Sequence, residues 1–179
     1  GIHGNQLFQA IKDPLLLTAV AVNTDAFQSG REVPNIITAP FWNEYMEIGG
    51  SGCTIGLIVA ILLISHREDM KKIAKLSLVP GIFNINEPII FGLPIILNPI
   101  LAVPFIITPI ITGGIGYFLT SIGFAGKAVI MVPWTTPPII SAYLSTAGSI
   151  GAVITQIICL IASVVIYLPF VKICNKMNN

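Results

Sequence analysis

The stretch Phe83–Ile111 reads FNINEPIIFGLPIILNPILAVPFIITPII, which is almost wholly apolar and rich in proline. The last four of its prolines recur every five residues, at Pro94, Pro99, Pro104 and Pro109. This spacing matches neither the period of a helix nor that of a strand, and proline inside a helix removes a hydrogen bond. In a membrane, broken backbone persists only where it is buried in protein or lines a wet cavity. We therefore expect re-entrant hairpins and discontinuous helices within residues 77–126, the elements from which transporters build binding sites.

The composition of the whole chain indicates a membrane protein. Of its 179 residues, 54% are hydrophobic and only 9% are charged, whereas an average soluble domain has roughly 25% charged residues. So few charges cannot coat a water-facing globule, which argues against a soluble enzyme. The length allows roughly four to six membrane crossings of about 20 residues each.

Two uncharged stretches are long enough to cross a bilayer. Ile48–Ser65 has 18 residues and Ile150–Val171 has 22; at about 1.5 Å per residue the shorter one just covers the hydrocarbon core. Residues 1–47 are more polar, and their apolar run Leu15–Val22 predicts at most a half-crossing or a membrane-facing loop. The predicted fold is an all-α integral membrane protein, a transmembrane helix bundle with re-entrant helical hairpins and proline-broken helices.

Basic residues follow both of these stretches. The loop 66–76 carries Arg67, Lys71, Lys72 and Lys75, and the C-terminal segment carries Lys172 and Lys176. The positive-inside rule predicts that the 66–76 loop and the C-terminus are both cytoplasmic. The chain between them must then make a net single crossing. The alternative for the loop is a solvated surface that says nothing about orientation.

Glu87 is the only charged residue between Lys75 and Lys127. A charge at bilayer depth costs at least ~2.5 kcal/mol, so such a residue usually faces a cavity. Pro88 suits the first turn of a helix, whose N-terminus would stabilise the carboxylate. With Asn84 and Asn86 beside it, the carboxylate offers hydrogen bonds that suit a polyhydroxylated ligand. The alternative is a glutamate paired with a cation such as Lys127 to lock the bundle.

Two further residues are candidates for chemistry or recognition. His3 is flanked by glycine and can titrate near neutral pH, although a lone histidine is more often structural. Trp134, between Pro133 and Thr135, could stack on a sugar ring, or it could be an interfacial tryptophan. The cysteines Cys53, Cys159 and Cys174 fit no metal or disulfide spacing and are interpreted as packing residues. The residues predict no metal site and no cofactor, and a net charge of +1 gives no basis for a nucleic-acid partner.

Four ordered motifs together resemble a known family. They are GIHG (1–4), FWNEYMEIGGSG (41–52), FNINEPIIFG (83–92) and VPWTTPP (132–138). In this combination the chain resembles enzyme IIC (EIIC), the membrane component of bacterial sugar phosphotransferase systems (PTS), of the lactose/cellobiose/diacetylchitobiose class. The resemblance covers essentially the whole chain. It implies that residues 1–179 are the C-terminal sugar-binding and transport part of a longer membrane domain, without its N-terminal half.

The resemblance also implies an activity and its partners. Such a protein is a multi-pass permease of the bacterial plasma membrane, a homodimer that works with IIA and IIB proteins in a phosphoenolpyruvate-dependent system. It binds a β-linked disaccharide, such as cellobiose or diacetylchitobiose, and presents the C6 hydroxyl to a phosphocysteine of IIB. No phosphate-binding loop is found in this chain, which agrees with a phosphoryl donor on a partner protein.

The roles of single residues follow from the resemblance by position. His3 and Glu87 are the catalytic candidates: His3 lies near the hydroxyl that receives phosphate, and Glu87 holds that end of the sugar. The substrate-binding candidates are Asn84, Asn86, Trp134, Thr135, Thr136, and the backbone around Gly49, Gly50, Ser51 and Gly52. Two other functions stay open on the residues alone: an ion- or proton-coupled secondary transporter, in which Glu87 carries the coupling charge, and a structural membrane subunit without a substrate.

Overall fold

The computed structural model describes residues 4–176, and all regular structure in this range is helical. The elements in chain order are α1 (Gly4–Gln28), α2 (Ala39–Phe41), the π-helix η1 (Trp42–Met46), α3 (Thr54–Ile64), α4 (Glu68–Ile82), α5 (Glu87–Gly92), the 3-10 helix η2 (Ile95–Leu97), α6 (Pro99–Ser121), α7 (Ile140–Ser145) and α8 (Ile150–Lys176). The prediction of an all-α fold is confirmed.

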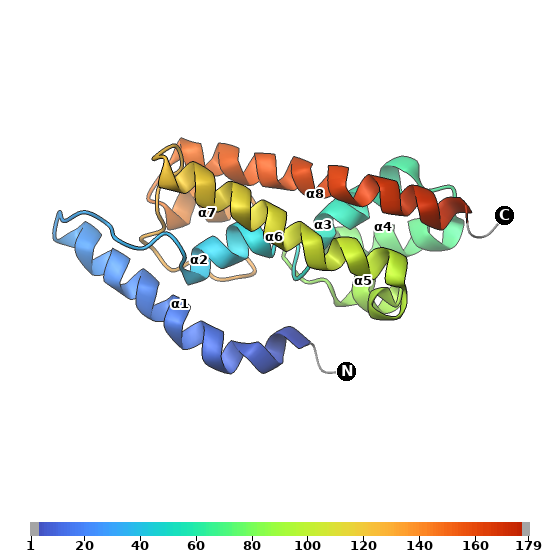
Figure 1. The fold of residues 1–179 in the computed structure, drawn as a ribbon, viewed down its shortest axis with the longest axis horizontal. Helices are drawn as coiled ribbons and strands as arrows, with labels where there is room; N and C mark the ends of the chain where they lie inside the picture. The colour runs from blue at the N-terminus through green and yellow to red at the C-terminus, as the bar shows by residue number, and fades with distance from the viewer. Residues whose placement is uncertain (1–3, 177–179) are drawn as a thin grey trace.

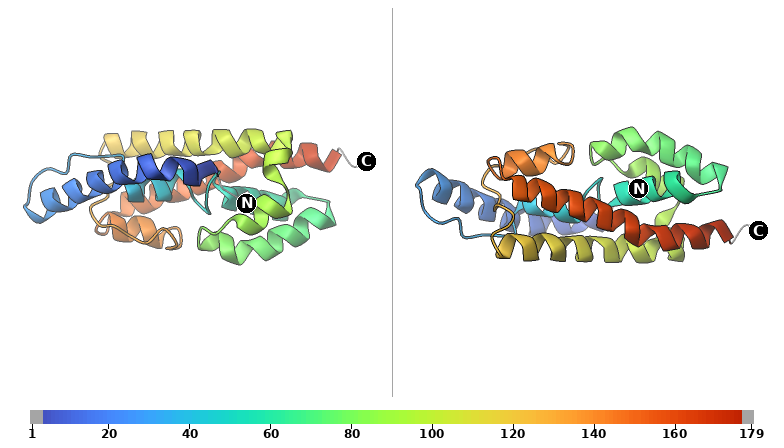
Figure 2. Two further views of the ribbon diagram at one scale, coloured as in Figure 1. Left: turned by 90° about the horizontal axis from the view of Figure 1, so that it is seen from below. Right: turned by 90° about the horizontal axis from the view of Figure 1, so that it is seen from above.

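Helices α6 and α8 form the long axis of the molecule. They pack against each other and run in opposite directions (Figures 1 and 2). With 23 and 27 residues, both are long and apolar enough to cross a membrane. The predicted crossing at Ile150–Val171 is therefore confirmed, and α8 extends it to Lys176.

The crossing predicted for Ile48–Ser65 is wrong in its first half. Helix α3 begins only at Thr54 and has 11 residues. The preceding loop turns in left-handed backbone, with positive φ angles at Gly49, Gly50, Gly52 and Cys53. Helix α4 then returns along α3, so the two form a helical hairpin. The glycine-rich composition that looked compatible with a helix instead permits a turn that other residues rarely adopt.

The proline-rich region divides into two parts. Between residues 83 and 98 the chain is broken into the short helices α5 and η2, as predicted. From residue 99 onward the prediction of discontinuous helices is wrong, because α6 continues through Pro104 and Pro109. Threonine hydroxyls inside α6 donate to carbonyls one turn back: Thr108 to Pro104 at 2.7 Å and Thr112 to Thr108 at 3.0 Å. Both of these bonds lie within α6 itself.

Helix α1 replaces the half-crossing or loop expected around residues 15–22. It has 25 residues, includes Pro14, and lies along one side of the molecule (Figure 1). Its C-terminal part is fixed to the loop after α6. Asn23 Nδ2 donates to the Ala128 carbonyl at 2.8 Å, and the Thr24 hydroxyl donates to the Val129 carbonyl at 2.6 Å.

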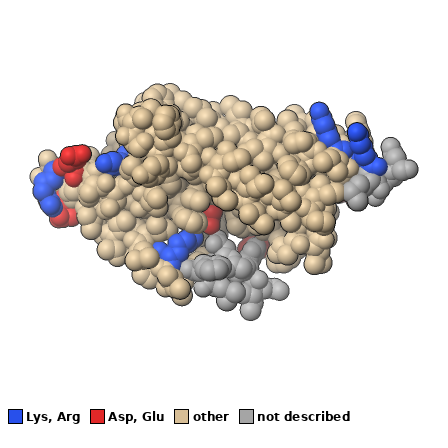
Figure 3. All heavy atoms as spheres, viewed as in Figure 1, with Lys and Arg blue, Asp and Glu red and all other residues tan. Residues whose placement is uncertain are grey.

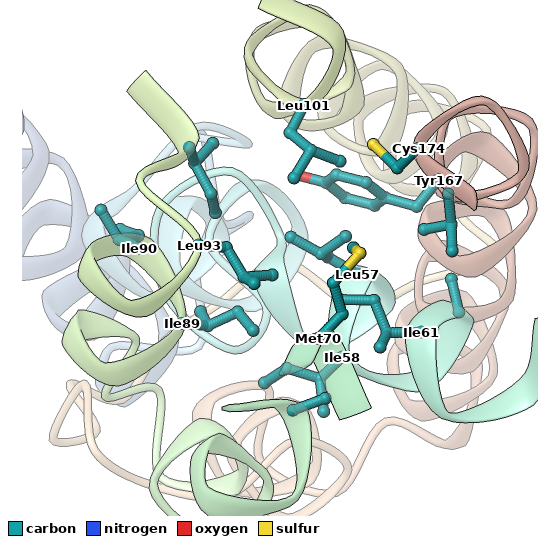
Figure 4. Packing of buried hydrophobic residues seen from close by; sticks show 14 residues of the cluster. Leu57, Ile58, Ile61, Met70, Ile89, Ile90, Leu93, Leu101, Tyr167 and Cys174 are labelled. Atoms are coloured by element: carbon teal, nitrogen blue, oxygen red, sulfur yellow. The ribbon is translucent and has the colours of Figure 1, made fainter. Parts of the chain in front are cut away.

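The largest apolar core holds the α3–α4 hairpin and α5 against α6 and α8 (Figure 4). Leu57, Ile61 and Ile89 are fully buried in it, and the Tyr167 hydroxyl donates to the Gly52 carbonyl at 2.7 Å. The three cysteines are buried in the apolar clusters, as the packing interpretation predicts. The hydrogen bond from Tyr167 thus ties the glycine-rich loop to the core.

The two basic flanks lie at the same end of the molecule. The Asn175 side chain accepts a hydrogen bond from the backbone N–H of His66 at 3.2 Å and donates to the Ile64 carbonyl at 3.0 Å. Helix α6 carries the chain from this end to the opposite one, which agrees with the predicted net single crossing (Figure 1). Figure 3 shows a broad uncharged surface, with charged side chains at the two ends and in the hollow between them.

Candidate sugar-binding pocket

A cavity of about 370 Å³ lies between α1 and the irregular segments of the molecule. One wall is a face of α1, and the other is built from η1, the glycine-rich loop, the start of α5 and the segment around residue 134. It brings together six of the residues predicted to form the site: Gly50, Ser51, Asn84, Asn86, Glu87 and Trp134.

Gly50 allows two of these segments to touch. Its φ angle is +94°, and a Cβ atom there would lie 2.5 Å from Cγ of Asn86. Without that Cβ, Asn86 reaches the loop and its Nδ2 donates to the Ser51 carbonyl at 2.9 Å and to the Ser51 hydroxyl at 3.2 Å. The glycine is therefore required both by the backbone turn and by the close approach.

Asn84 joins three segments of the pocket wall. Its Oδ1 accepts from the Gly49 N–H at 2.8 Å, and its Nδ2 donates to the carbonyls of Trp134 at 2.6 Å and Thr136 at 3.1 Å. Asn84 itself has a φ angle of +62°, which asparagine tolerates better than most residues. Its amide is thus used to hold the glycine-rich loop and the Trp134 segment in place.

Glu87 is the first residue of α5, directly before Pro88, so the predicted helix start at this point is confirmed. Glu87 is exposed and is one of the residues that line the cavity, where a charge at membrane depth is expected to lie. The proposed cation partner is engaged elsewhere: Lys127 Nζ donates to the Val33 carbonyl at 2.7 Å. Glu87 therefore lies at the cavity and not in the core.

The structure adds a charged cluster that the sequence analysis did not single out. Lys12 Nζ lies 3.7 Å from Glu47 Oε1 and 4.7 Å from the ring centroid of Trp42, and the Trp42 indole N–H donates to Glu47 Oε1 at 2.9 Å. All three residues line the cavity. Trp42 and Glu47 belong to the FWNEYMEIGGSG motif, so the motif itself could have indicated them as site residues alongside its glycines.

Four of the predicted residues, Gly49, Gly52, Thr135 and Thr136, are not among those that line this cavity. Thr136 lines a second, smaller cavity, and its carbonyl is bound by Asn84. Thr135 is not among the residues that line either cavity. His3 lies outside the described residues.

The charges of the cavity suit a neutral polar ligand. Among the described residues that line the cavity, Asp13, Glu47 and Glu87 carry carboxylates and Lys12 carries an ammonium group. Carboxylates accept hydrogen bonds from hydroxyls, and the exposed indole of Trp134 offers a flat apolar face. Within residues 4–176, no group of three histidine, cysteine or acidic residues could hold a metal ion. Hydroxyl-rich molecules with an apolar ring face match this arrangement.

Comparison with known proteins identifies the family. Residues 1–109 match the family model described as "Phosphotransferase system, EIIC". The chain is 44% identical to the lichenan permease IIC component of Bacillus subtilis, a match that covers 99% of this chain and 40% of that protein. It is 38% identical to the cellobiose-specific EIIC component of Geobacillus stearothermophilus, with the same coverages.

A solved structure shares the fold. The crystal structure of the transporter ChbC, the IIC component of an N,N'-diacetylchitobiose-specific phosphotransferase system, matches with a TM-score of 0.94 and 42% identity. The match covers 99% of this chain and 41% of that one. The chain therefore spans about 40% of the length of the relatives it matches, and it belongs to the EIIC family of the phosphotransferase system, as part of an integral membrane protein.

Proposed function

We propose that the protein containing this chain is the sugar permease component of a phosphoenolpyruvate-dependent phosphotransferase system. It binds a β-linked disaccharide of the cellobiose or diacetylchitobiose type and presents the C6 hydroxyl for phosphorylation during uptake. The observation that carries the proposal is the convergence of Glu87, Trp134 and the glycine-rich loop on one cavity. Its volume of about 370 Å³ falls within the range usual for small-molecule sites, roughly 300–1,000 Å³.

Each group has a role in this proposal. Glu87 accepts hydrogen bonds from the sugar near C6, Trp134 stacks on a pyranose ring, and Ser51 and Gly50 bring backbone close to it. In the transfer step the C6 oxygen bonds to phosphorus while the phosphorus–sulfur bond of the IIB phosphocysteine breaks. The thiolate leaves, and the hydroxyl proton passes to His3. Catalysis by this chain then consists mainly of positioning and electrostatics.

The two asparagines serve the site mainly by holding its segments together. Their side-chain nitrogens already donate to Trp134, Thr136 and Ser51. We therefore assign Asn84 and Asn86 first of all to holding the pocket walls together. Contact of either amide oxygen with sugar stays a prediction, as does that of Thr135 and Thr136.

The excess of carboxylates favours release of the product. A neutral disaccharide meets three carboxylates without electrostatic cost, whereas a phosphorylated sugar carries close to two negative charges. Like charges within a few ångströms repel each other, most strongly where water is scarce. The same cavity should then bind the substrate and expel the phosphosugar.

The partners and the location follow from the family. The proposal includes a homodimer in the bacterial plasma membrane that works with IIA and with phosphorylated IIB. The 66–76 loop and the C-terminus, which meet through Asn175, then lie on the cytoplasmic side.

The test uses the full-length protein and a panel of disaccharides. We expect Glu87→Gln to weaken binding of the preferred disaccharide at least tenfold, because hydrogen bonds to a charged group contribute about 1.5–3 kcal/mol. Glu68→Gln is the matched control, since Glu68 is exposed and forms only a surface ion pair with Lys71 at 3.4 Å. Absence of disaccharide binding, or an unchanged rate of sugar phosphorylation by phospho-IIB in Glu87→Gln, would contradict the proposal.

A further inference from the structure

Glu44 is a buried carboxyl group that the pocket described above does not use. It lies in η1, within three residues of the pocket residues Trp42, Asn43 and Glu47. Only 2% of its surface is exposed, and neither of its carboxyl oxygens has a hydrogen-bond partner in the structure. Buried polar atoms in native proteins are nearly always hydrogen-bonded, so this exception calls for an explanation.

The carboxyl lies on a small cavity beside the sugar pocket. This second cavity has a volume of about 10 Å³, close to the space that one water molecule needs. It shares Asn43, Asn84 and Trp134 with the main cavity. The cavity beside Glu44 therefore has part of its wall in common with the main cavity.

The surroundings of Glu44 provide no counter-charge. Neither α2, α6, α7 nor the segment 132–139 contains an acidic or basic residue. The buried Tyr45 hydroxyl on η1 is a titratable group that interacts with Glu44, and the hydroxyl of Ser145 on α7 lies beside the carboxyl. An ionised carboxylate without a partner is costly in such a site, whereas a protonated one is tolerated. We therefore take Glu44 to be neutral when the pocket has the observed shape.

The Trp134 segment above Glu44 is held under strain. Ile139, at its end, has a φ angle of +76°, which is unfavourable for a β-branched residue. It is kept there by Gln156 of α8, whose Oε1 accepts from the Ile139 N–H at 2.5 Å. The Nε2 of the same side chain donates to the Glu44 carbonyl at 3.1 Å and to the Ser141 hydroxyl at 3.2 Å. Gln156 therefore joins η1 and the Trp134 segment around the buried carboxyl.

We propose that Glu44 is a positioning residue of the sugar pocket that must carry a proton for the Trp134 segment to stay in place. Loss of the proton creates a charge that the single water-sized space of the small cavity cannot solvate, and more water can enter only if the strained segment moves away. Trp134 and the carbonyls bound by Asn84 move with it, so sugar binding weakens. This inference rests on the proposed function, because it takes the large cavity to be the sugar site.

The test compares the full-length protein with its Glu44→Gln variant. Cellobiose binding, or diacetylchitobiose binding where cellobiose does not bind, is measured from about pH 6 to about pH 9.5, where a raised carboxyl titration falls. We expect equal affinities at the acidic end, since glutamine mimics the neutral acid. Towards the alkaline end the unmodified protein should lose affinity, by up to about tenfold per pH unit, while Glu44→Gln keeps it. Glu68→Gln is the control and should follow the unmodified protein.

A second measurement covers the case in which Glu44→Gln does not fold. Calorimetric titration of the unmodified protein in two buffers with different ionisation enthalpies counts protons, and sugar binding in the alkaline range should take up protons. In the observed structure the Ser145 hydroxyl donates to the Ala142 carbonyl at 3.4 Å, but it is close enough to turn to an ionised Glu44. Ser145→Ala lacks this donor, so its loss of affinity should move to higher pH.

The outcomes separate the two proposals. Identical pH profiles for the unmodified protein and Glu44→Gln overturn the role of Glu44 and leave the permease proposal standing. An unmoved profile in Ser145→Ala together with no proton uptake does the same. Absence of binding by either disaccharide at any pH overturns both.

Discussion

Residues 83–98 and residues 99–121 have similar composition and opposite structures. Both are apolar and proline-rich, yet the first is broken into α5 and η2 and the second is one continuous helix. The difference lies in the polar residues. The broken part contains Asn84, Asn86 and Glu87, whose side chains bond to distant backbone or face the cavity. The continuous part has threonines, which bond to their own helix. In this protein the partners of the polar side chains, more than the prolines, decide where the helix ends.

The largest effect is expected at Gly50, which allows Asn86 of the broken part to pack against the glycine-rich loop. Gly50→Ala places a Cβ about 2.5 Å from the Asn86 side chain and forces alanine into a left-handed conformation. We expect the free energy of unfolding of the full-length protein to fall by about 2 kcal/mol or more, with loss of sugar binding. Thermal unfolding in detergent and a sugar titration measure the two effects.

The matched control for that variant lies in the continuous part. Gly114 of α6 has helical backbone and open space around its Cα. Gly114→Ala should leave sugar binding unchanged and stabilise the protein by about 0.5–1 kcal/mol, because alanine is the better helix former. Equal losses of stability and of sugar binding in the two variants would mean that the broken and the continuous parts tolerate a glycine substitution equally well, which would contradict our interpretation.

An intermediate effect is expected from the polar side chains themselves. Asn84→Ala removes three hydrogen bonds that join separate segments, so we expect a destabilisation of about 2–3 kcal/mol and weaker sugar binding. Thr120→Val in α6 removes one bond within a helix, from the Thr120 hydroxyl to the Gly116 carbonyl at 2.7 Å, and should cost less than about 1 kcal/mol, with unchanged binding. Similar effects on sugar affinity from both variants would contradict the distinction between inter-segment and intra-helix bonds.

The smallest effect is expected at the exposed ion pair between Arg67 and Asp69. Near the turn between α3 and α4, the Arg67 guanidinium bonds to the Asp69 carboxylate and lowers the pKa of Asp69. A lowered pKa adds stability above the unfolded-state pKa of Asp69, and this stability is lost as the pH falls through the folded-state value. Because the pair is exposed, Asp69→Asn should cost roughly 0–1 kcal/mol at neutral pH and nothing in acid. A loss that persists in acid would rule out this ion pair as its cause.

The fold was predictable where one stretch of sequence decides the structure. The 22 uncharged residues of Ile150–Val171 predict a crossing, and α8 supplies it. The start of the first crossing was misplaced because Gly49, Gly50 and Gly52 are compatible with close helix packing as well as with a left-handed turn. The choice depends on Asn84 and Asn86, about 35 residues away, whose side chains bind that loop.

The site was predictable from its motifs only in part. Glu87 and Trp134 stand out because their residue types are unusual in apolar surroundings, and both line the cavity. The cluster of Lys12, Trp42 and Glu47 was not predicted, because charged residues are common in the first third of the chain. These three residues meet only where α1 lies beside η1 in the folded structure. Glu44 stands in the same polar part of the sequence, and its burial comes from the packing of η1 against α6 and α8.

The clamp formed by Asn84 limits how the site can travel. One amide fixes the backbone at residues 49, 134 and 136, at distances of 2.6–3.1 Å. None of these points can shift by even an ångström relative to the others without breaking a hydrogen bond. Any displacement that carries a bound sugar from one side of the bilayer to the other must therefore move the glycine turn, the α5 start and the tryptophan together as a single rigid unit.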